Sequence, residues 1–208
     1  MRVSHLTSIA LVSLALAGPV FAQGGHAGMH GDAHGGKGPM SHDTMKSSPN
    51  AARAAFDHQF IDTMIVHHQS AIDMAQLVDK RAGHDELKQM ARKMMDDQQR
   101  EISQLQDWKQ QWYAGKGDAV NMAMPGMAES MKGMPMEKMA SASGADFEAL
   151  FIDAMVRHHR GAVRMAELAQ KKAGHPELKK MSQDIIREQK KEIADMLKWK
   201  KEWKLTKK

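Results

Sequence analysis

Residues 60–75 read FIDTMIVHHQSAIDMA, and residues 151–166 read FIDAMVRHHRGAVRMA. The two stretches align without a gap at an offset of 91 residues, and each carries a His-His pair three residues after a methionine. The same offset relates several later positions, so the chain contains an internal repeat. These positions are Gly83 and Gly174, His84 and His175, Gln98 and Gln189, Trp108 and Trp199, and Trp112 and Trp203.

Apolar side chains recur at intervals of three and four residues through both copies, which is typical of helices with one buried face. This spacing predicts helices over about 51–80 and 85–113, and again over about 146–172 and 176–204. A short Gly-His turn joins the two helices of each pair, so we expect each pair to form an antiparallel hairpin. A single hairpin would leave its apolar face in water. The sequence therefore predicts an all-α fold, a four-helix bundle of two repeated helical hairpins.

The remaining segments differ in composition from the helices. Residues 1–22 have the basic start, apolar run and small residues of a signal peptide cleaved after Ala22. Residues 23–50 are rich in Gly, His and Met, and we predict a disordered tail. The bundle domain would span residues 51–208, as a hairpin over 51–113, a long Met-rich crossover loop over 114–145 and a hairpin over 146–208. We expect a periplasmic or secreted protein that has no membrane contact after signal removal.

Composition narrows the chemistry. The chain has 20 Met and no Cys, so any sulfur ligand in this exported protein must be a thioether. Without Arg2, the mature chain has 29 basic and 25 acidic residues, a formal net charge of +4. This weak charge is spread along the helices and does not indicate nucleic-acid binding.

The repeated motif offers ligands for a soft metal ion, because residues three and four apart share a helix face. Imidazole and thioether suit copper(I) and the similar silver(I), whereas zinc usually recruits Cys or carboxylate as well. Adjacent histidines point about 100° apart on a helix. His67 lies at the centre of the buried stripe and is the better ligand, while His68 would serve a neighbouring site or face the next helix. The candidate metal ligands of the two copies are Met64, His67, His68, Met155, His158 and His159.

Other residues near the motif have two interpretations. Met74 and Met165 lie further along the same stripe, as additional ligands or as plain core. Asp62 and Asp153 would orient a ligand histidine or form an ion pair with a neighbouring helix. His84 and His175 precede helices, and we expect them to be turn residues.

The loop and the tail could also collect metal. The loop methionines show no evident period, so we interpret them as copper(I) ligands, with oxidant scavenging as the alternative. The tail histidines are interpreted as a metal-collecting segment, with a plain Gly-rich leader as the alternative. The selected positions are Met122, Met124, Met127, Met134 and Met136 in the loop, and His26, His30 and His34 in the tail.

The quoted motif, its second copy and the helix ends at Glu101-Ile102 and Trp108, repeated at Glu192-Ile193 and Trp199, resemble the domain of unknown function 305 family. The resemblance covers about residues 56–203 and implies a ferritin-like bundle. It also implies a relation to CopM-like periplasmic copper-binding proteins, with metal held by the Met-His-His positions. The second copy departs from the first where Arg157 stands at the place of Val66 and Gly161 at the place of Ser70.

Three functions follow from these observations. The first is a non-enzymatic protein that sequesters or relays copper(I) or silver(I) and exchanges it with a periplasmic donor or acceptor protein. The second is a two-metal oxidase, for which Asp97, Glu101, Glu188 and Glu192 would supply carboxylates. The third is a helical adaptor or chaperone without a metal role, whose methionines form an adaptable surface. The sequence leaves the oligomeric state open.

Overall fold

The computed structural model describes residues 45–205, and this part of the chain is helical without a strand. A 3-10 helix over Ala51–Arg53 precedes the bundle. None of the described helices is both long and apolar enough to cross a membrane. The α-helices are α1 (Phe56–Ala75), α2 (Val78–Arg81), α3 (Asp85–Tyr113), α4 (Met127–Met131), α5 (Met136–Ser141), α6 (Gly144–Lys172) and α7 (Pro176–Glu202).

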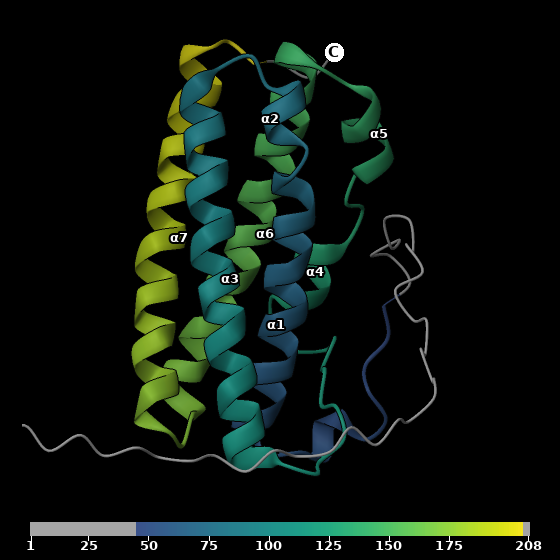
Figure 1. Ribbon diagram of the computed structural model, residues 1–208, viewed down its shortest axis with the longest axis vertical. Coiled ribbons are helices and arrows are strands. Elements are labelled where there is room, and N and C mark those ends of the chain that lie inside the picture. The colour runs from purple at the N-terminus through teal and green to yellow at the C-terminus, as the bar shows by residue number, and fades with distance from the viewer. Residues whose placement is uncertain (1–44, 206–208) are drawn as a thin grey trace, which may run out of the picture. The chain divides into compact units, whose positions relative to one another are not determined.

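The four long helices form the predicted ferritin-like bundle of two hairpins (Figure 1). Helix α1 pairs with α3, α6 pairs with α7, and α1 packs against α6 where the two hairpins meet. The observed helices agree with the predicted ranges, except that the first predicted helix is divided. Helix α1 ends at Ala75, and the chain resumes as the single turn α2 at Val78. The crossover from α3 to α6 runs along the length of the bundle, so α3 and α6 point in the same direction (Figure 1).

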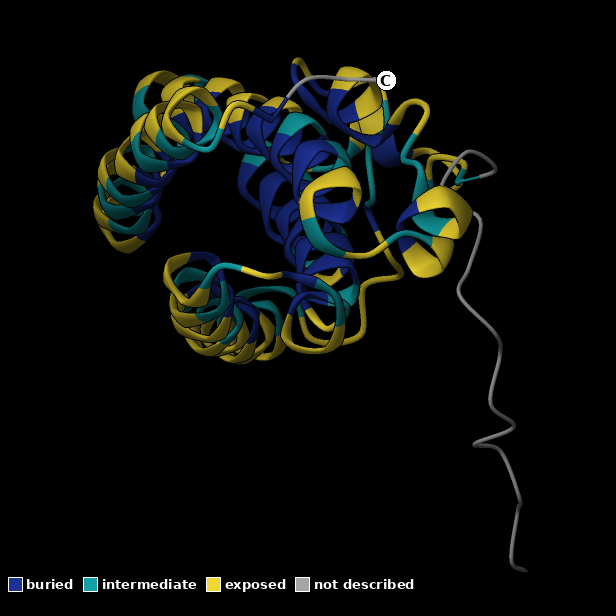
Figure 2. Cartoon of the chain, turned by 90° about the horizontal axis from the view of Figure 1, so that it is seen from above, coloured by how far each residue is buried: buried dark blue, intermediate teal, exposed yellow. Residues whose placement is uncertain are grey.

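The core lies between α1 and α6 and has two apolar clusters, one towards each end of the bundle. Figure 2, viewed along the helices, shows the buried residues concentrated at the centre. One cluster contains Met64 together with Met165, and the other contains Met74 together with Met155. Each cluster therefore joins the start of one central helix to the end of the other, as an approximate twofold relation between antiparallel helices requires.

The Met-rich crossover differs from the predicted irregular loop. It forms α4 and α5, and it buries Met124, Met127, Met131 and Met139 in the core. Met124, Met127 and Met131 are spaced by three and then four residues, which is a short helical stripe that the sequence reasoning overlooked. The expectation that the loop methionines do not belong to the core was wrong for these four residues, because α4 and α5 both pack onto α6. Whether they bind copper(I) stays a prediction.

The turns at the ends of the bundle link the two hairpins. Asp57 on α1 accepts hydrogen bonds from the backbone N–H groups of Gly174 and His175, and its carboxylate also contacts Nδ1 of His175 at 2.5 Å. The His175 ring stacks on Trp112, with ring centroids 3.7 Å apart. At the other end, Glu148 on α6 binds the Gly83-His84 turn in the same way, and His84 stacks on Trp203. His84 and His175 are thus turn residues, as predicted.

Candidate metal centre

Two buried histidines meet where α1 crosses α6. The rings of His67 and His158 have centroids 3.7 Å apart at an interplanar angle of 31°, and neither residue is exposed to solvent. The repeat brings them together because both lie at the centre of their helix's buried stripe. The two copies of the motif thus place one histidine each in direct ring contact.

Each ring is held through Nε2 by a serine hydroxyl. His158 Nε2 lies 2.8 Å from Ser70 Oγ, and His67 Nε2 lies 3.1 Å from Ser130 Oγ. Ser70 donates its hydrogen to the His67 carbonyl, and Ser130 donates to the Met127 carbonyl. A hydroxyl has one hydrogen, so a serine that donates to a carbonyl oxygen can accept a hydrogen bond from the histidine Nε2–H beside it. With Ser130 donating to the Met127 carbonyl, this arrangement leaves the lone pair of His67 on Nδ1.

Burial sets the charge of this centre. It lowers the pKa of His67 well below the ordinary value of 6.5, and the nearby His68 and His159 lower it further, while the His158 backbone has a smaller opposite effect. His67 is therefore neutral at pH 7. Among the described residues, nothing hydrogen-bonds to Nδ1 of His67. A buried, neutral imidazole with an unused lone pair is suited to binding a metal ion without releasing a proton.

Ser130, on helix α4 of the crossover, supplies a hydroxyl group that the second repeat lacks. The position that corresponds to Ser70 is Gly161, which has no hydroxyl. A Cβ atom at Gly161 would lie 2.4 Å from Ser130 Cβ and 2.4 Å from the Gly126 carbonyl oxygen. The glycine thus makes room for α4, and α4 provides the hydroxyl for His67. The departure at Gly161 is visible in the sequence, whereas its link to Ser130 depends on the packing of α4 against α6.

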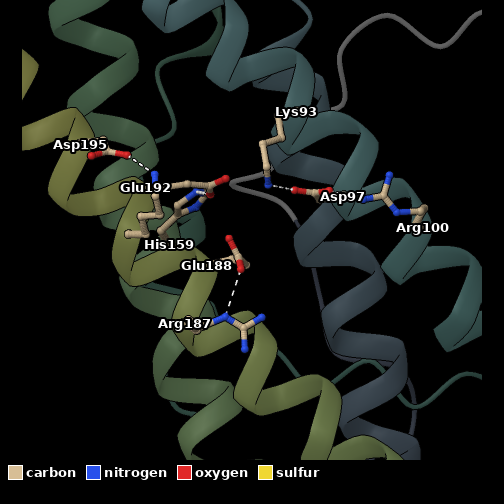
Figure 3. Close-up of polar contacts among 9 residues, drawn as sticks. Lys93, Asp97, Arg100, His159, Arg187, Glu188, Glu192 and Asp195 are labelled. Carbon is tan, nitrogen blue, oxygen red and sulfur yellow. Dashed lines mark hydrogen bonds and ion pairs between the residues drawn. The ribbon is translucent and has the colours of Figure 1, made fainter.

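The second histidine of each pair faces away from this centre. His68 Nε2 lies 2.7 Å from Glu101 Oε2 on α3, and His159 Nε2 lies 2.7 Å from Glu192 Oε2 on α7. Figure 3 shows His159 directed at Glu192. Within each pair the ring centroids are 6.2 Å apart. The expectation that His67 lies at the centre and that His68 faces the next helix is therefore confirmed.

The aspartates of the motif form ion pairs with lysines of the neighbouring helices. Asp62 pairs with Lys109 on α3, with Nζ 2.8 Å from Oδ1, and Asp153 pairs with the equivalent Lys200 on α7. Asp62 also accepts a hydrogen bond from the backbone N–H of Ala119. Of the two interpretations left open for these residues, the ion pair is correct.

The crossover also contributes a thioether sulfur, that of Met131 on α4. Met131 Sδ lies 3.4 Å from Ser70 Oγ, the same hydroxyl that holds His158, and Met131 is buried. Met131 was not among the predicted ligands, although its spacing of four residues from Met127 places both on one helix face. The four predicted motif methionines are fully buried in the two apolar clusters that flank the histidines, namely Met64, Met74, Met155 and Met165.

The other predicted ligands lie outside this centre. Met122, Met134 and Met136 are partly buried against the apolar clusters, and Met124 and Met127 are core residues. The predicted tail ligands His26, His30 and His34 are outside the described residues. Within residues 45–205, no group of three or more His, Cys, Asp or Glu side chains could hold a metal ion. A thioether such as that of Met131 could complete a centre at His67 and His158, and this donor set fits copper(I) or silver(I).

Comparison with known proteins shows the family and the fold of the chain. The profile of the family named Domain of unknown function (DUF305) matches residues 14–109 and 57–200. The structure resembles CopM in the Cu(I)-bound form, with 37% sequence identity and a TM-score of 0.60 over 71% of this chain and 96% of that chain. CopM in a silver-bound form obtained by co-crystallization is 36% identical, with a TM-score of 0.58 over 71% and 96% of the two chains.

A DUF305 protein from Streptomyces coelicolor, described as secreted, is 25% identical, with a TM-score of 0.66 over 77% of this chain and 98% of that chain. No curated protein matches the sequence. The longer profile match covers both hairpins and both His-His pairs, and on that evidence the chain belongs to the DUF305 family.

Proposed function

We propose that this protein binds copper(I), and silver(I) in its place, and sequesters or relays the ion in the periplasm. The supporting observation is the buried centre at the α1 and α6 crossing, where two imidazoles face each other beside the thioether of Met131. Low-coordinate copper(I) accepts this combination of soft donors. The copper-bound and silver-bound forms of CopM, a relative at 36–37% identity, support a copper-related role.

His67 and His158 would each offer Nδ1, and Ser130 and Ser70 would keep the ring orientations by holding Nε2. Partners of this kind fix the tautomer of a ligand histidine. The surrounding methionine clusters exclude water, which favours a weakly hydrated monovalent ion over a strongly hydrated divalent one. A signal peptide at residues 1–22, as the sequence predicts, would bring this chemistry to an oxidising compartment, where thioethers persist and thiols are lost to disulfides.

The alternatives receive less support from the geometry. A two-metal oxidase needs carboxylates that bridge two ions, whereas Glu101 and Glu192 each contact one histidine in separate hairpins. An adaptor without a metal role does not account for two histidines buried against each other. We therefore propose a binding protein that is not an enzyme, and a copper donor or acceptor protein as its partner.

A competition titration with a copper(I) chelator tests this proposal. We expect H67F and H158F to weaken the tightest site by at least about 100-fold, because loss of a partner of a ligand alone costs 10–100-fold. M131L, which keeps the volume and removes the sulfur, should weaken it by about 10-fold or more. H84Q changes a turn histidine and should leave the affinity unchanged. Unchanged affinity in H67F and H158F, both shown to be folded by circular dichroism, would refute the proposal.

A trimmed protein separates the bundle from the flexible segments. Residues 47 and 48 bond to the crossover, since Ser48 N–H donates to the Val120 carbonyl and Ser47 Oγ accepts from Met122 N–H. The truncation should therefore begin at Met45. Of the loop methionines, only Met122, Met134 and Met136 can be replaced without removing core. We expect the tight site to survive both changes, and its loss would assign copper capture to those segments.

A further inference from the structure

A polar groove runs between α3 and α7, on the side of the bundle away from the crossover. It has a volume of about 420 Å³, and its lining comes from these two helices alone. Figure 3 shows Lys93, Asp97 and Arg100 on one helix facing Glu188 and Glu192 on the other. The charged lining residues comprise five acids and three bases, namely Asp97, Glu101, Asp184, Glu188 and Glu192, and Lys93, Arg100 and Arg187.

The bases on the rim are already paired. Lys93 and Arg100 both bind Asp97, and Arg187 binds Asp184 and Glu188. Glu101 and Glu192 instead contact the histidines below them. Among the acidic residues that line the groove, Glu101 and Glu192 therefore form no ion pair with a lysine or arginine of the described part of the chain. They lie at equivalent positions of the repeat.

Each carboxylate has an unsatisfied amide beside it. Gln98 and Gln189 line the groove, are only 3% exposed, and occupy equivalent positions one helical turn before Glu101 and Glu192. Within residues 45–205, neither Gln98 Oε1 nor Gln189 Oε1 has a hydrogen-bond donor. A buried carbonyl oxygen without a partner is costly and calls for an explanation. Both copies of the repeat have this unpaired carbonyl oxygen, which indicates a common cause. A cation bound in the groove would be such a cause, because the oxygen could coordinate it.

We propose that each wall of the groove binds one divalent cation, using His68, Glu101 and Gln98 in the first repeat and His159, Glu192 and Gln189 in the second. One imidazole nitrogen, one carboxylate oxygen and one amide oxygen suit borderline and hard ions such as Zn²⁺, Co²⁺ or Mn²⁺, and do not suit copper(I). His159 and Glu192 share a hydrogen bond, and His68 Nε2 lies 2.7 Å from Glu101 Oε2 without one that satisfies it. In each set a cation would lie between the imidazole and the carboxylate.

The two sites are separate, and the protein supplies only three ligands to each ion. No group of three His, Asp or Glu side chains among the described residues could hold one ion, so the two walls do not form a single shared centre. Three protein ligands leave coordination positions that water from the open groove can fill. Such a site would exchange its ion with solvent, unlike the buried centre at His67 and His158. This proposal is independent of copper(I) binding, because the two centres have no ligand in common.

Equilibrium dialysis of the full mature protein against Co²⁺ tests the groove sites. We expect E101Q or E192Q to bind one ion fewer than the wild type, and the double variant two fewer. Each single variant keeps one repeat intact as an internal control for folding. In the proton NMR spectrum, hyperfine-shifted imidazole signals from His68 and His159 should disappear one at a time in these variants.

Two controls separate the groove from other sites. D97N/E188Q removes rim carboxylates that are paired with bases and should retain the wild-type number of Co²⁺ ions. H67F/H158F should lose copper(I) binding and keep Co²⁺ binding. The proposal is overturned if E101Q/E192Q binds as much Co²⁺ as the wild type, or if the shifted histidine signals persist in it. Either result would leave the proposed copper(I) function standing.

Discussion

The two hairpins are close copies, and they differ where they meet the crossover. His158 receives its hydroxyl from Ser70 on the opposite repeat, whereas His67 receives one from Ser130 on α4. Both noted departures of the second copy face this segment, since Gly161 accommodates α4 and Arg157 Nη2 lies 3.4 Å from the Gly133 carbonyl oxygen. The two hairpins therefore depart from symmetry where the second one packs against the crossover, and the hydroxyl that Gly161 lacks comes from Ser130 on the crossover.

Placing a side chain at Gly161 should have the largest effect on this arrangement. In G161A, the new Cβ would clash with Ser130 Cβ and the Gly126 carbonyl oxygen, and α4 would have to move. We expect the free energy of unfolding in urea to fall by about 3 kcal/mol, the upper part of the usual cost of overpacking. G117A is the matched control, because a Cβ there meets nothing within 4 Å. Equal stability of G161A and the wild type would show that α4 is not held at this point.

Removing the two hydroxyls compares the two repeats directly. S130A and S70A each leave a buried Nε2–H without its acceptor, which costs about 1–3 kcal/mol. We expect similar losses of unfolding free energy from both variants, although one serine belongs to the repeat and the other to the crossover. S141A, an exposed serine on α5, is the control. If S70A clearly lowered the unfolding free energy and S130A did not, the two hydroxyls would not have equivalent roles.

The pH dependence of the unfolding free energy tests the lowered pKa of His67. Its pKa is lowered by burial, so below pH 6.5 the unfolded chain binds a proton that the folded chain does not. Unfolding free energy should therefore decrease as the pH falls below about 6.5, with a slope from this group of at most about 1.4 kcal/mol per pH unit. Urea titrations of the metal-free protein at pH 7.5, 6.5 and 5.5 measure this slope. H67Q should show a shallower slope, and an unchanged slope would mean that His67 titrates normally.

The smallest effect is expected at Arg157. Its contact with the Gly133 carbonyl is long and exposed, and such contacts contribute little. We expect R157V, which restores the residue of the first copy, to change the unfolding free energy by less than about 0.5 kcal/mol. A loss above 1 kcal/mol in the same urea assay would show that this departure also anchors the crossover.

Much of the fold was predictable because helices carry local signals. The three-and-four spacing and the Gly-His turns predicted α3, α6 and α7 to within a few residues at each end. The 100° rotation between neighbours was enough to separate the role of His67 from that of His68. The methionines of α4 were misjudged because Pro and Gly interrupt the segment, although Met124, Met127 and Met131 do follow a helical spacing.

By itself, the sequence determined the helices, the repeat, the absence of thiols and the type of donor atoms, since these depend on residue identity and on spacing within one turn or two. Only the tertiary structure decided which donors meet. Ser130 lies 63 residues from His67 in the chain, and Ser70 lies 88 residues from His158. Contacts at such separations depend on how helix faces and the crossover pack, and no local pattern encodes that packing.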